Sequence, residues 1–293
     1  MKKKTIFSGA ATALVTPFKN GKIDYMALKK IIEFQIQSSI DALVIGGTTG
    51  EASTLSDYER DKLYSFSAEA VNHRVPLIFG IGSNDTKRAI KYAKRAKDFG
   101  ADALLSVTPY YNKGTQDGIV FHYQRIANST DLPTIIYNVP SRTSVNLSID
   151  AIGKLSEEDN ICAIKEASDS ADRLIELSAL SDRLTLYAGN DTQIYTSLAL
   201  GGMGVISVLS NAYPCEVLDI TNAFWRGDSE AALISQRNVI SRVHALFLET
   251  NPTPIKYVMH LLGFCEYDMR LPLYPPTEKT RDVLKSEFFK TKI

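Results

Sequence analysis

The chain contains few cysteines and few histidines, and it lacks an excess of charge of either sign. Its three cysteines, Cys162, Cys215 and Cys265, lie far apart and form no Cys-x-x-Cys pair. An odd number of scattered cysteines argues against a disulfide framework and against a cysteine zinc site. We therefore expect a protein of the reducing cytoplasm.

Charge and hydropathy argue against two further classes of protein. The 33 basic and 33 acidic residues among 293 cancel, so no net charge attracts nucleic acid or an anionic membrane. Polar residues interrupt every apolar run before the ~18 residues that span a bilayer, so we expect no transmembrane helix. The basic residues 2–4 and the apolar stretch 6–15 are similar to a secretory signal, but Ser8, Gly9 and Thr12 interrupt the stretch and favour a first β-strand.

Short apolar runs alternate with amphipathic segments along most of the chain. Segments of helical spacing include 26–38, 56–72, 86–100 and 118–130. The eight apolar runs are 11–15, 42–45, 76–81, 103–107, 133–137, 161–165, 184–187 and 204–208. Continuous apolar strands joined by helices pair in parallel, so the pattern predicts an α/β fold, and eight units predict a closed (β/α)8 TIM barrel. An open doubly wound sheet is the alternative, but no Gly-x-Gly-x-x-Gly turn follows an early strand.

The strand pattern stops after residue 208. The segments that follow have helical spacing and are punctuated by prolines; they are 214–225, 229–249, 254–262 and 278–288. We predict a catalytic barrel over residues 1–228 and a C-terminal helical domain over residues 229–293.

In a (β/α)8 barrel, reactive groups lie at the carboxyl ends of the strands and in the loops that follow. Those positions are rich in threonine and tyrosine here and hold one strand-terminal lysine, Lys165. The four histidines, His73, His122, His244 and His260, fall within or beside predicted helices. No histidine metal cluster and no Ser-His-Asp set is therefore expected at the barrel mouth, and metal-dependent chemistry is not predicted.

Lys165 ends the otherwise apolar run 161–165. Burial disfavours a charged ammonium, and a neutral amine is the nucleophile that forms a Schiff base with a ketone. The alternative is a lysine that pairs with Glu166 or extends to solvent. Tyr137 ends the preceding strand, so it can share a pocket with Lys165 and move protons there, although a packed strand tyrosine fits the same pattern.

Two loops offer groups that bind anions. The glycine-flanked Thr48-Thr49 turn has free backbone N–H groups and hydroxyls that suit a carboxylate or a phosphate, or it is a purely structural turn. Arg142, in the fifth strand-to-helix loop, can bind a second carboxylate through its planar guanidinium, or it is a solvated loop arginine.

Taken together, four motifs resemble the pyruvate-dependent class I aldolase family of dihydrodipicolinate synthase and N-acetylneuraminate lyase. The motifs are Gly46-Gly47-Thr48-Thr49-Gly50-Glu51, Tyr137-Asn138-Val139-Pro140, Ile164-Lys165-Glu166-Ala167 and Gly204-Val205-Ile206-Ser207-Val208. The resemblance runs from about residue 9 into the C-terminal helices.

The resemblance implies a role for individual residues. Lys165 would form the imine with pyruvate, and Thr48 and Thr49 would hold the pyruvate carboxylate. Tyr137, Thr48 and Tyr111 would relay protons, with Tyr111 contributed across a subunit interface. The backbones of two further residues, Gly189 and Ile206, would line the pocket. The family is commonly a dimer of dimers, so a homotetramer is expected.

Residues 110–112 and 141–143 are similar to the synthase branch of this family, in which the arginine binds the carboxylate of aspartate semialdehyde. The implied reaction is condensation of pyruvate with L-aspartate 4-semialdehyde to 4-hydroxy-tetrahydrodipicolinate, on the route to diaminopimelate and lysine, with no metal or organic cofactor. A lyase for a sialic or 2-keto-3-deoxy sugar acid is the alternative, and Arg142 argues against it. A non-catalytic barrel that binds a keto acid is the rival from another class.

One departure from the family concerns regulation. Lysine-inhibited members bind lysine at an interface cleft, and the matching residues here include Asn84, Arg88 and Tyr110. Arg88 stands where an acidic residue would hold the ammonium of lysine, so repulsion replaces attraction. We expect little or no inhibition by lysine.

Overall fold

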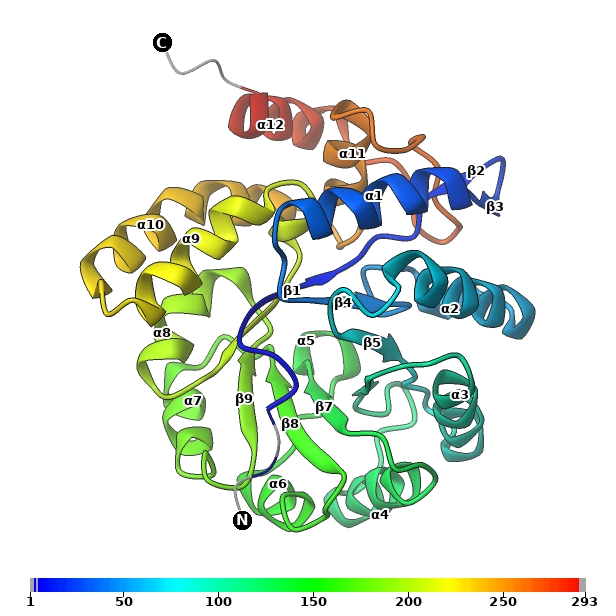
Figure 1. The fold of residues 1–293 in the computed structure, drawn as a ribbon, viewed down its shortest axis with the longest axis vertical. Helices are drawn as coiled ribbons and strands as arrows, with labels where there is room; N and C mark the ends of the chain where they lie inside the picture. The colour runs from blue at the N-terminus through cyan, green and yellow to red at the C-terminus, as the bar shows by residue number, and fades with distance from the viewer. Residues whose placement is uncertain (1–2, 4, 290–293) are drawn as a thin grey trace.

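The centre of the computed structural model, which describes residue 3 and residues 5–289, is a closed barrel of eight parallel strands (Figure 1). The strand order is β1-β10-β9-β8-β7-β6-β5-β4, and β1 pairs with both β10 and β4. The strands are β1 Gly9–Ala13, β4 Ala42–Ile45, β5 Leu77–Gly80, β6 Ala103–Val107, β7 Thr134–Asn138, β8 Ile161–Glu166, β9 Thr185–Ala188 and β10 Gly204–Ser207. The predicted (β/α)8 barrel is therefore confirmed.

Helices connect successive strands and cover the outside of the barrel (Figure 1). They are α1 Tyr25–Gln37, α2 Asp57–Val71, α3 Thr86–Asp98, α4 Gln116–Ala127, α6 Ile149–Leu155, α7 Ala171–Ser178, α8 Ile194–Ala199 and α9 Pro214–Trp225. The shorter elements are the hairpin strands β2 Phe18–Lys19 and β3 Lys22–Ile23, the single turn α5 Pro140–Thr143, and the 3-10 turns η1 Ala52–Thr54, η2 Asp191–Gln193 and η3 Leu209–Asn211. This order places a loop after every barrel strand, which is where the site forms.

Side-chain caps fix where several helices begin. Asp24, Asp85, Thr115 and Ser148 each accept a hydrogen bond from a backbone N–H in the first turn of the helix that follows. Such caps satisfy amide groups that have no partner within the helix. The start of each helix, and so the length of the loop before it, is set by a short polar residue in the sequence.

The alternation of side chains along β8 separates the barrel interior from the layer outside it. Ala163 packs inside the barrel, whereas Ile164 packs with the cluster beneath the helices. Because successive strand residues point to opposite faces, Lys165 shares the inner face with Ala163, and Glu166 shares the outer face with Ile164. The inner layer contains many small residues, including Ala11 and Ala42, and this leaves room for longer side chains near the mouth.

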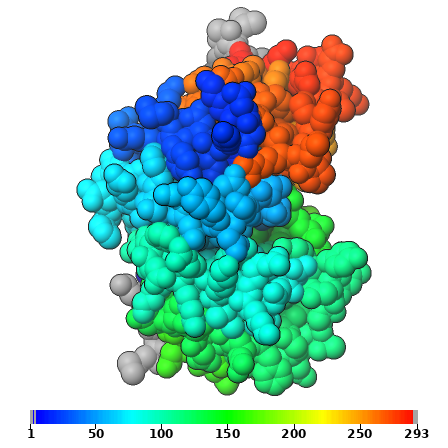
Figure 2. Space-filling view, turned by 90° about the vertical axis from the view of Figure 1, so that its right-hand side faces the viewer, coloured from blue at the N-terminus to red at the C-terminus, as the bar shows by residue number. Residues whose placement is uncertain are grey.

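Up to residue 289, where the described part of the chain ends, the C-terminal appendage contains the helices α10 Ser229–Leu246, α11 Thr253–Leu261 and α12 Glu278–Phe289. Figure 2 shows the C-terminal segment in orange beside the N-terminal elements in blue, and Arg270 donates to the carbonyl of Gly21 there. One hydrophobic cluster contains barrel and appendage residues alike, and the boundary at 228/229 stays a prediction. The predicted helix 229–249 ends earlier, because 247–251 turns toward the barrel mouth.

No helix in the described part of the chain has the length and apolar character needed to cross a membrane. Residues 9–13 form β1, as expected for a first strand. The basic run 2–4 was compared above with the start of a secretory signal. Two of its residues, Lys2 and Lys4, lie outside the described residues.

Candidate active site

Lys165 and Tyr137 face each other from neighbouring strands. They are partners in the register of β7 and β8, and the Lys165 Nζ lies 4.3 Å from the centre of the Tyr137 ring. Only 4% of Lys165 is exposed. The alternative of a lysine that pairs with Glu166 or extends into solvent does not describe this structure, because Glu166 points away from the barrel interior to Arg173.

These two side chains lie in a cavity of about 610 Å³ at the carboxyl ends of the strands. Six of the residues predicted from the sequence line it, namely Thr48, Thr49, Tyr137, Arg142, Lys165 and Gly189. After the end of β10, Val208 also lines the cavity. Ile206 is fully buried in the inner cluster of the barrel, and its predicted place at the pocket stays a prediction.

Tyr111 does not reach this cavity in its own chain. It lies in the loop after β6, its φ angle is +72°, and it is 89% exposed. A positive φ is uncommon for a residue with a side chain, so the loop holds the tyrosine in a particular orientation. The role predicted for it across a subunit interface stays a prediction.

The Thr48-Thr49 turn is anchored from both sides. Thr16 donates to the carbonyl of Gly50 over 2.7 Å, and the amide of Asn251 donates to the Thr49 hydroxyl over 3.0 Å. Thr49 is buried and Thr48 is half-buried. Since the Thr49 oxygen already accepts a hydrogen bond, its own proton remains available to a ligand oxygen.

Asn251 is the main residue that the sequence analysis missed. Its side chain holds Thr49, and its carbonyl accepts a hydrogen bond of 3.0 Å from Arg142 Nη2. The Asn251 Oδ1 is buried and has no partner among the described residues. The segment 247–251 therefore completes the cavity wall from the C-terminal appendage. The only signal in the sequence was the Asn251-Pro252 dipeptide, which is typical of any turn.

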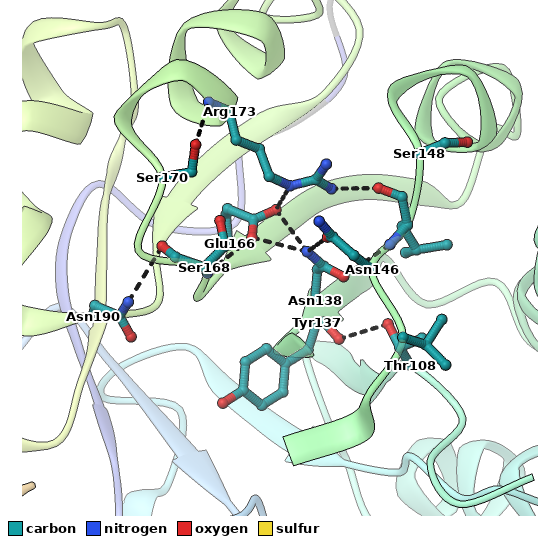
Figure 3. A network of polar contacts seen from close by, with 12 residues as sticks. Thr108, Tyr137, Asn138, Asn146, Ser148, Glu166, Ser168, Ser170, Arg173 and Asn190 are labelled. Atoms are coloured by element: carbon teal, nitrogen blue, oxygen red, sulfur yellow. Dashed lines mark hydrogen bonds and ion pairs between the residues drawn. The ribbon is translucent and has the colours of Figure 1, made fainter. Parts of the chain in front are cut away.

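A polar network holds the far side of β7 and β8 (Figure 3). Both oxygens of Glu166 accept from the Asn138 amide, at 2.9 and 3.1 Å, and they also accept from Arg173 Nε at 2.9 Å and from the Ser168 N–H at 3.0 Å. Arg173 Nη2 donates to the carbonyl of Leu147 over 2.6 Å. Because Asn138 and Glu166 follow Tyr137 and Lys165 directly, this network fixes the strands on which the two inward groups lie. The sequence analysis did not find it.

Two further residues, one in the cavity wall and one within the electrostatic influence of Lys165, belong to the surroundings of the site. A Cβ on Gly189 would lie 2.6 Å from the Cβ of Ala167, so that position requires glycine and presents backbone to the cavity. Asp191 is fully buried, and its Oδ2 accepts from the amides of Val208 and Leu209. Burial raises the pKa of the Asp191 carboxyl, while its hydrogen bonds and the charge of Lys165 oppose that rise.

Among residue 3 and residues 5–289, no group of three or more histidine, cysteine, aspartate or glutamate residues is placed to bind a metal ion. The residues that line the cavity include an amine, a phenol, hydroxyls and a guanidinium, together with the carboxyl group of Glu249 and the amides of Asn190 and Asn251. This set can form an imine, move protons and bind carboxylates.

Barrel and cavity together define a (β/α)8-barrel protein with a buried lysine at the carboxyl end of the sixth barrel strand. The model of the dihydrodipicolinate synthetase family matches residues 6–290, and the chain belongs to that family. A 4-hydroxy-tetrahydrodipicolinate synthase of Clostridium novyi (strain NT) is 44% identical over 283 residues, which are 96% of each chain. The dihydrodipicolinate synthase structure from Thermotoga maritima superposes with a TM-score of 0.94 at 38% identity, covering 97% of this chain and 98% of that one. The structure from Aquifex aeolicus gives 0.94 at 40% identity, covering 96% of both.

Proposed function

We propose that the chain condenses pyruvate with L-aspartate 4-semialdehyde to 4-hydroxy-tetrahydrodipicolinate through a Schiff base on Lys165. The observation that carries this proposal is the buried Lys165 amine, held against the Tyr137 ring inside a cavity that also presents Thr48 and Arg142. Relatives 44% identical over nearly the whole chain bear the name of the enzyme that makes this product.

The reaction begins with the amine. Lys165 Nζ attacks the C2 carbonyl carbon of pyruvate, and loss of water from the carbinolamine gives an imine. Loss of a methyl proton converts the imine into an enamine, whose carbon attacks the aldehyde carbon of the semialdehyde. The amine of the semialdehyde then attacks the imine carbon, closes the ring and releases Lys165 unchanged. The imine is the electron sink, so the proposed mechanism needs no metal and no organic cofactor.

The remaining residues bind and orient the substrates. Thr48 and Thr49 donate to the pyruvate carboxylate, and the fixed Asn251 contact leaves the Thr49 proton free for this. Tyr137 moves the protons that carbinolamine collapse and enamine formation require. Arg142 binds the carboxylate of the semialdehyde, with one nitrogen tied to the Asn251 carbonyl. The backbone around Gly189 completes the pocket.

Trapping with borohydride tests the proposal directly. Pyruvate plus borohydride should add one reduced pyruvate to the chain, and peptide mapping should place it on Lys165. Lys165→Ala should remove the adduct, whereas Lys154→Ala, at an exposed lysine, should retain it. Arg142→Ala should keep the adduct and raise the KM for the semialdehyde. An unchanged mass after trapping, or faster turnover of N-acetylneuraminate than of the semialdehyde, would contradict the proposal.

We also propose that the enzyme is a homo-oligomer, a tetramer made of two dimers, in which Tyr111 completes the proton relay of a neighbouring subunit. The support is the ring of Tyr111, which is held outside its own chain. Mixing inactive Lys165→Ala and Tyr111→Phe subunits then creates mixed dimers with one intact site. Recovery of about a quarter of the wild-type activity is expected from random pairing, and no recovery would exclude the shared site.

Two finer expectations accompany this function. The three cysteines are free, which supports a cytoplasmic location.

The second expectation concerns regulation. Arg88 and Tyr110 line a second cavity, and no aspartate or glutamate of the described residues lies in its wall. This supports weak or absent inhibition by lysine. Micromolar inhibition by lysine in a steady-state assay would contradict the second expectation.

A further inference from the structure

The cavity around Lys165 has one carboxylate in its wall among the described residues, that of Glu249. The other charged side chains that line it there are Arg142 and Lys165, and the proposed mechanism uses both of them. It gives no part to Glu249, which belongs to the segment 247–251 that closes the wall from the C-terminal appendage. A carboxylate beside a substrate cavity attracts a cationic group of the substrate.

One charged group of the two proposed substrates lacks a partner in the site. Pyruvate carries a carboxylate, and the semialdehyde carries a carboxylate and an ammonium on the same carbon. Thr48 and Thr49 are proposed to bind the first carboxylate, and Arg142 the second. The ammonium therefore needs an acidic partner close to Arg142, since removing an unpaired charge from water is unfavourable.

The backbone holds Glu249 close to Arg142. Arg142 Nη2 donates to the Asn251 carbonyl over 3.0 Å, and the two residues of chain from Asn251 back to Glu249 span at most about 7 Å. Glu249 Oε1 accepts from the N–H of Thr277 over 2.9 Å and from its hydroxyl over 2.8 Å. Because a carboxylate offers about four acceptor positions, these two bonds leave Oε2 able to accept from an ammonium.

The Glu249 carboxyl also keeps its negative charge. Burial opposes its ionisation, but hydrogen bonds from Thr280 and Thr277 and the nearby charge of Arg281 hold its pKa below the ordinary value for a glutamate. The group is therefore ionised at neutral pH, as the binding of a cation requires.

We propose that Glu249 is a specificity-determining residue, whose carboxylate binds the ammonium of L-aspartate 4-semialdehyde while Arg142 binds the substrate carboxylate. This inference rests on the proposed function. With the aldehyde directed at the enamine on Lys165, three groups around the asymmetric carbon of the substrate are then held. In the D enantiomer the ammonium and the hydrogen of that carbon exchange places, so the ammonium loses Glu249 when the other two groups stay bound. The contact acts before ring closure, for which the ammonium first loses a proton to water.

Glu249→Gln tests this role, with the L and D enantiomers of the semialdehyde as probes. The substitution keeps the size of the side chain but removes its charge, so the KM for the L enantiomer should rise about tenfold or more. The ratio of kcat/KM for the L enantiomer to that for the D enantiomer should fall by a similar factor. Succinate semialdehyde lacks the amine, so its inhibition constant should change less than about twofold. Initial rates of pyruvate consumption give all three quantities.

Two control variants separate recognition of the ammonium from support of α12. Glu278→Gln makes the same change at an exposed residue that does not line the cavity, and the L-to-D ratio should stay within about twofold of the wild type. Thr277→Val removes the hydroxyl that Glu249 Oε1 accepts from, so it should lower the Tm and leave the ratio within the same limit. An unchanged ratio in Glu249→Gln, or an equal fall in Glu249→Gln and Thr277→Val, would overturn the proposal.

Borohydride trapping with pyruvate, run on every protein, separates this inference from the proposed function. An adduct on Lys165 together with an unchanged L-to-D ratio in Glu249→Gln contradicts only the role of Glu249, whereas a wild type without an adduct contradicts the proposed function itself. Should Glu249→Gln not fold, the wild type carries the test. The inhibition constant of succinate semialdehyde should then exceed the KM of the L enantiomer about tenfold, and equal values would overturn the proposal.

Discussion

Asn251 shows how much one side chain and its own carbonyl can organise. Its amide fixes the Thr49 hydroxyl, and its carbonyl fixes one nitrogen of Arg142. Asn251 therefore contacts both Thr49, which we propose binds pyruvate, and Arg142, which we propose binds the semialdehyde. Both groups therefore lose little conformational freedom when the substrates bind, which is the advantage of a preorganised site.

His122 is the residue through which we expect stability to depend on pH. It is 6% exposed on α4, its Nδ1 lies 2.9 Å from the Thr86 hydroxyl, and burial lowers its pKa to about 4. The unfolded chain, with an ordinary histidine pKa near 6.5, therefore binds more protons than the folded chain between those two values. The stability that the neutral imidazole contributes is complete above about pH 6.5 and is lost as the pH falls toward 4.

Replacing His122 by glutamine should remove this dependence. Between pH 7.0 and 5.5, the wild-type free energy of unfolding should fall by about 1 kcal/mol more than that of His122→Gln. Urea unfolding at a fixed protein concentration measures both proteins. His244→Gln, in the last turn of α10, is the control and should follow the wild type. The same pH slope in His122→Gln as in the wild type would refute the assignment.

At the scale of elements, the Glu166 network joins β7, β8 and α7 behind the proposed catalytic pair (Figure 3). Arg173→Met leaves the fully buried Glu166 carboxylate without its cation, so we expect a loss of about 3–5 kcal/mol in the free energy of unfolding. The rate of borohydride trapping should fall as well, since Lys165 adjoins Glu166. Urea unfolding and timed mass spectra measure the two effects.

An exposed ion pair provides the control for that variant. Arg183→Met breaks a contact of 3.9 Å with Glu157, and both side chains are largely exposed. Such pairs contribute about 0–1 kcal/mol, so stability and trapping rate should change little. If Arg173→Met were as mild as Arg183→Met, the network would have no part in holding β7 and β8 in register.

The elements themselves were largely predictable from the sequence, because their signals are local. Apolar runs fixed the strands to within a few residues, and the end of one run placed Lys165 beside Tyr137. The partners of Glu166 and Thr49 were not predictable, since Arg173 and Asn251 meet them only after the chain has folded.

For the molecule as a whole, a buried ion pair fastens the appendage to the barrel. The Nζ of Lys256, on α11, lies 2.5 Å from Oε1 of Glu51, and both side chains are fully buried. Glu51 follows the Thr48-Thr49 turn in the sequence. Lys256 also donates to the carbonyl of Asp268 over 2.6 Å, and its Nζ lies 4.5 Å from the centre of the Phe18 ring. Burial lowers the pKa of the Lys256 ammonium, and the charge of Glu51 opposes that change. The position of the Thr48-Thr49 turn, which we propose binds pyruvate, thus depends on a contact between two segments that lie 205 residues apart in the sequence.

A double-mutant cycle measures this contact. Lys256→Met leaves a buried carboxylate unpaired, so it should cost about 3–5 kcal/mol of unfolding free energy, whereas adding Glu51→Gln should restore part of that loss. The exposed pair Lys154 and Asp117, treated in the same way, should show a coupling below about 1 kcal/mol. Because the pair supports the Thr48-Thr49 turn, Lys256→Met should also raise the KM for pyruvate. If the Glu51 and Lys256 substitutions were simply additive in urea unfolding, the appendage and the turn would be held together by other contacts.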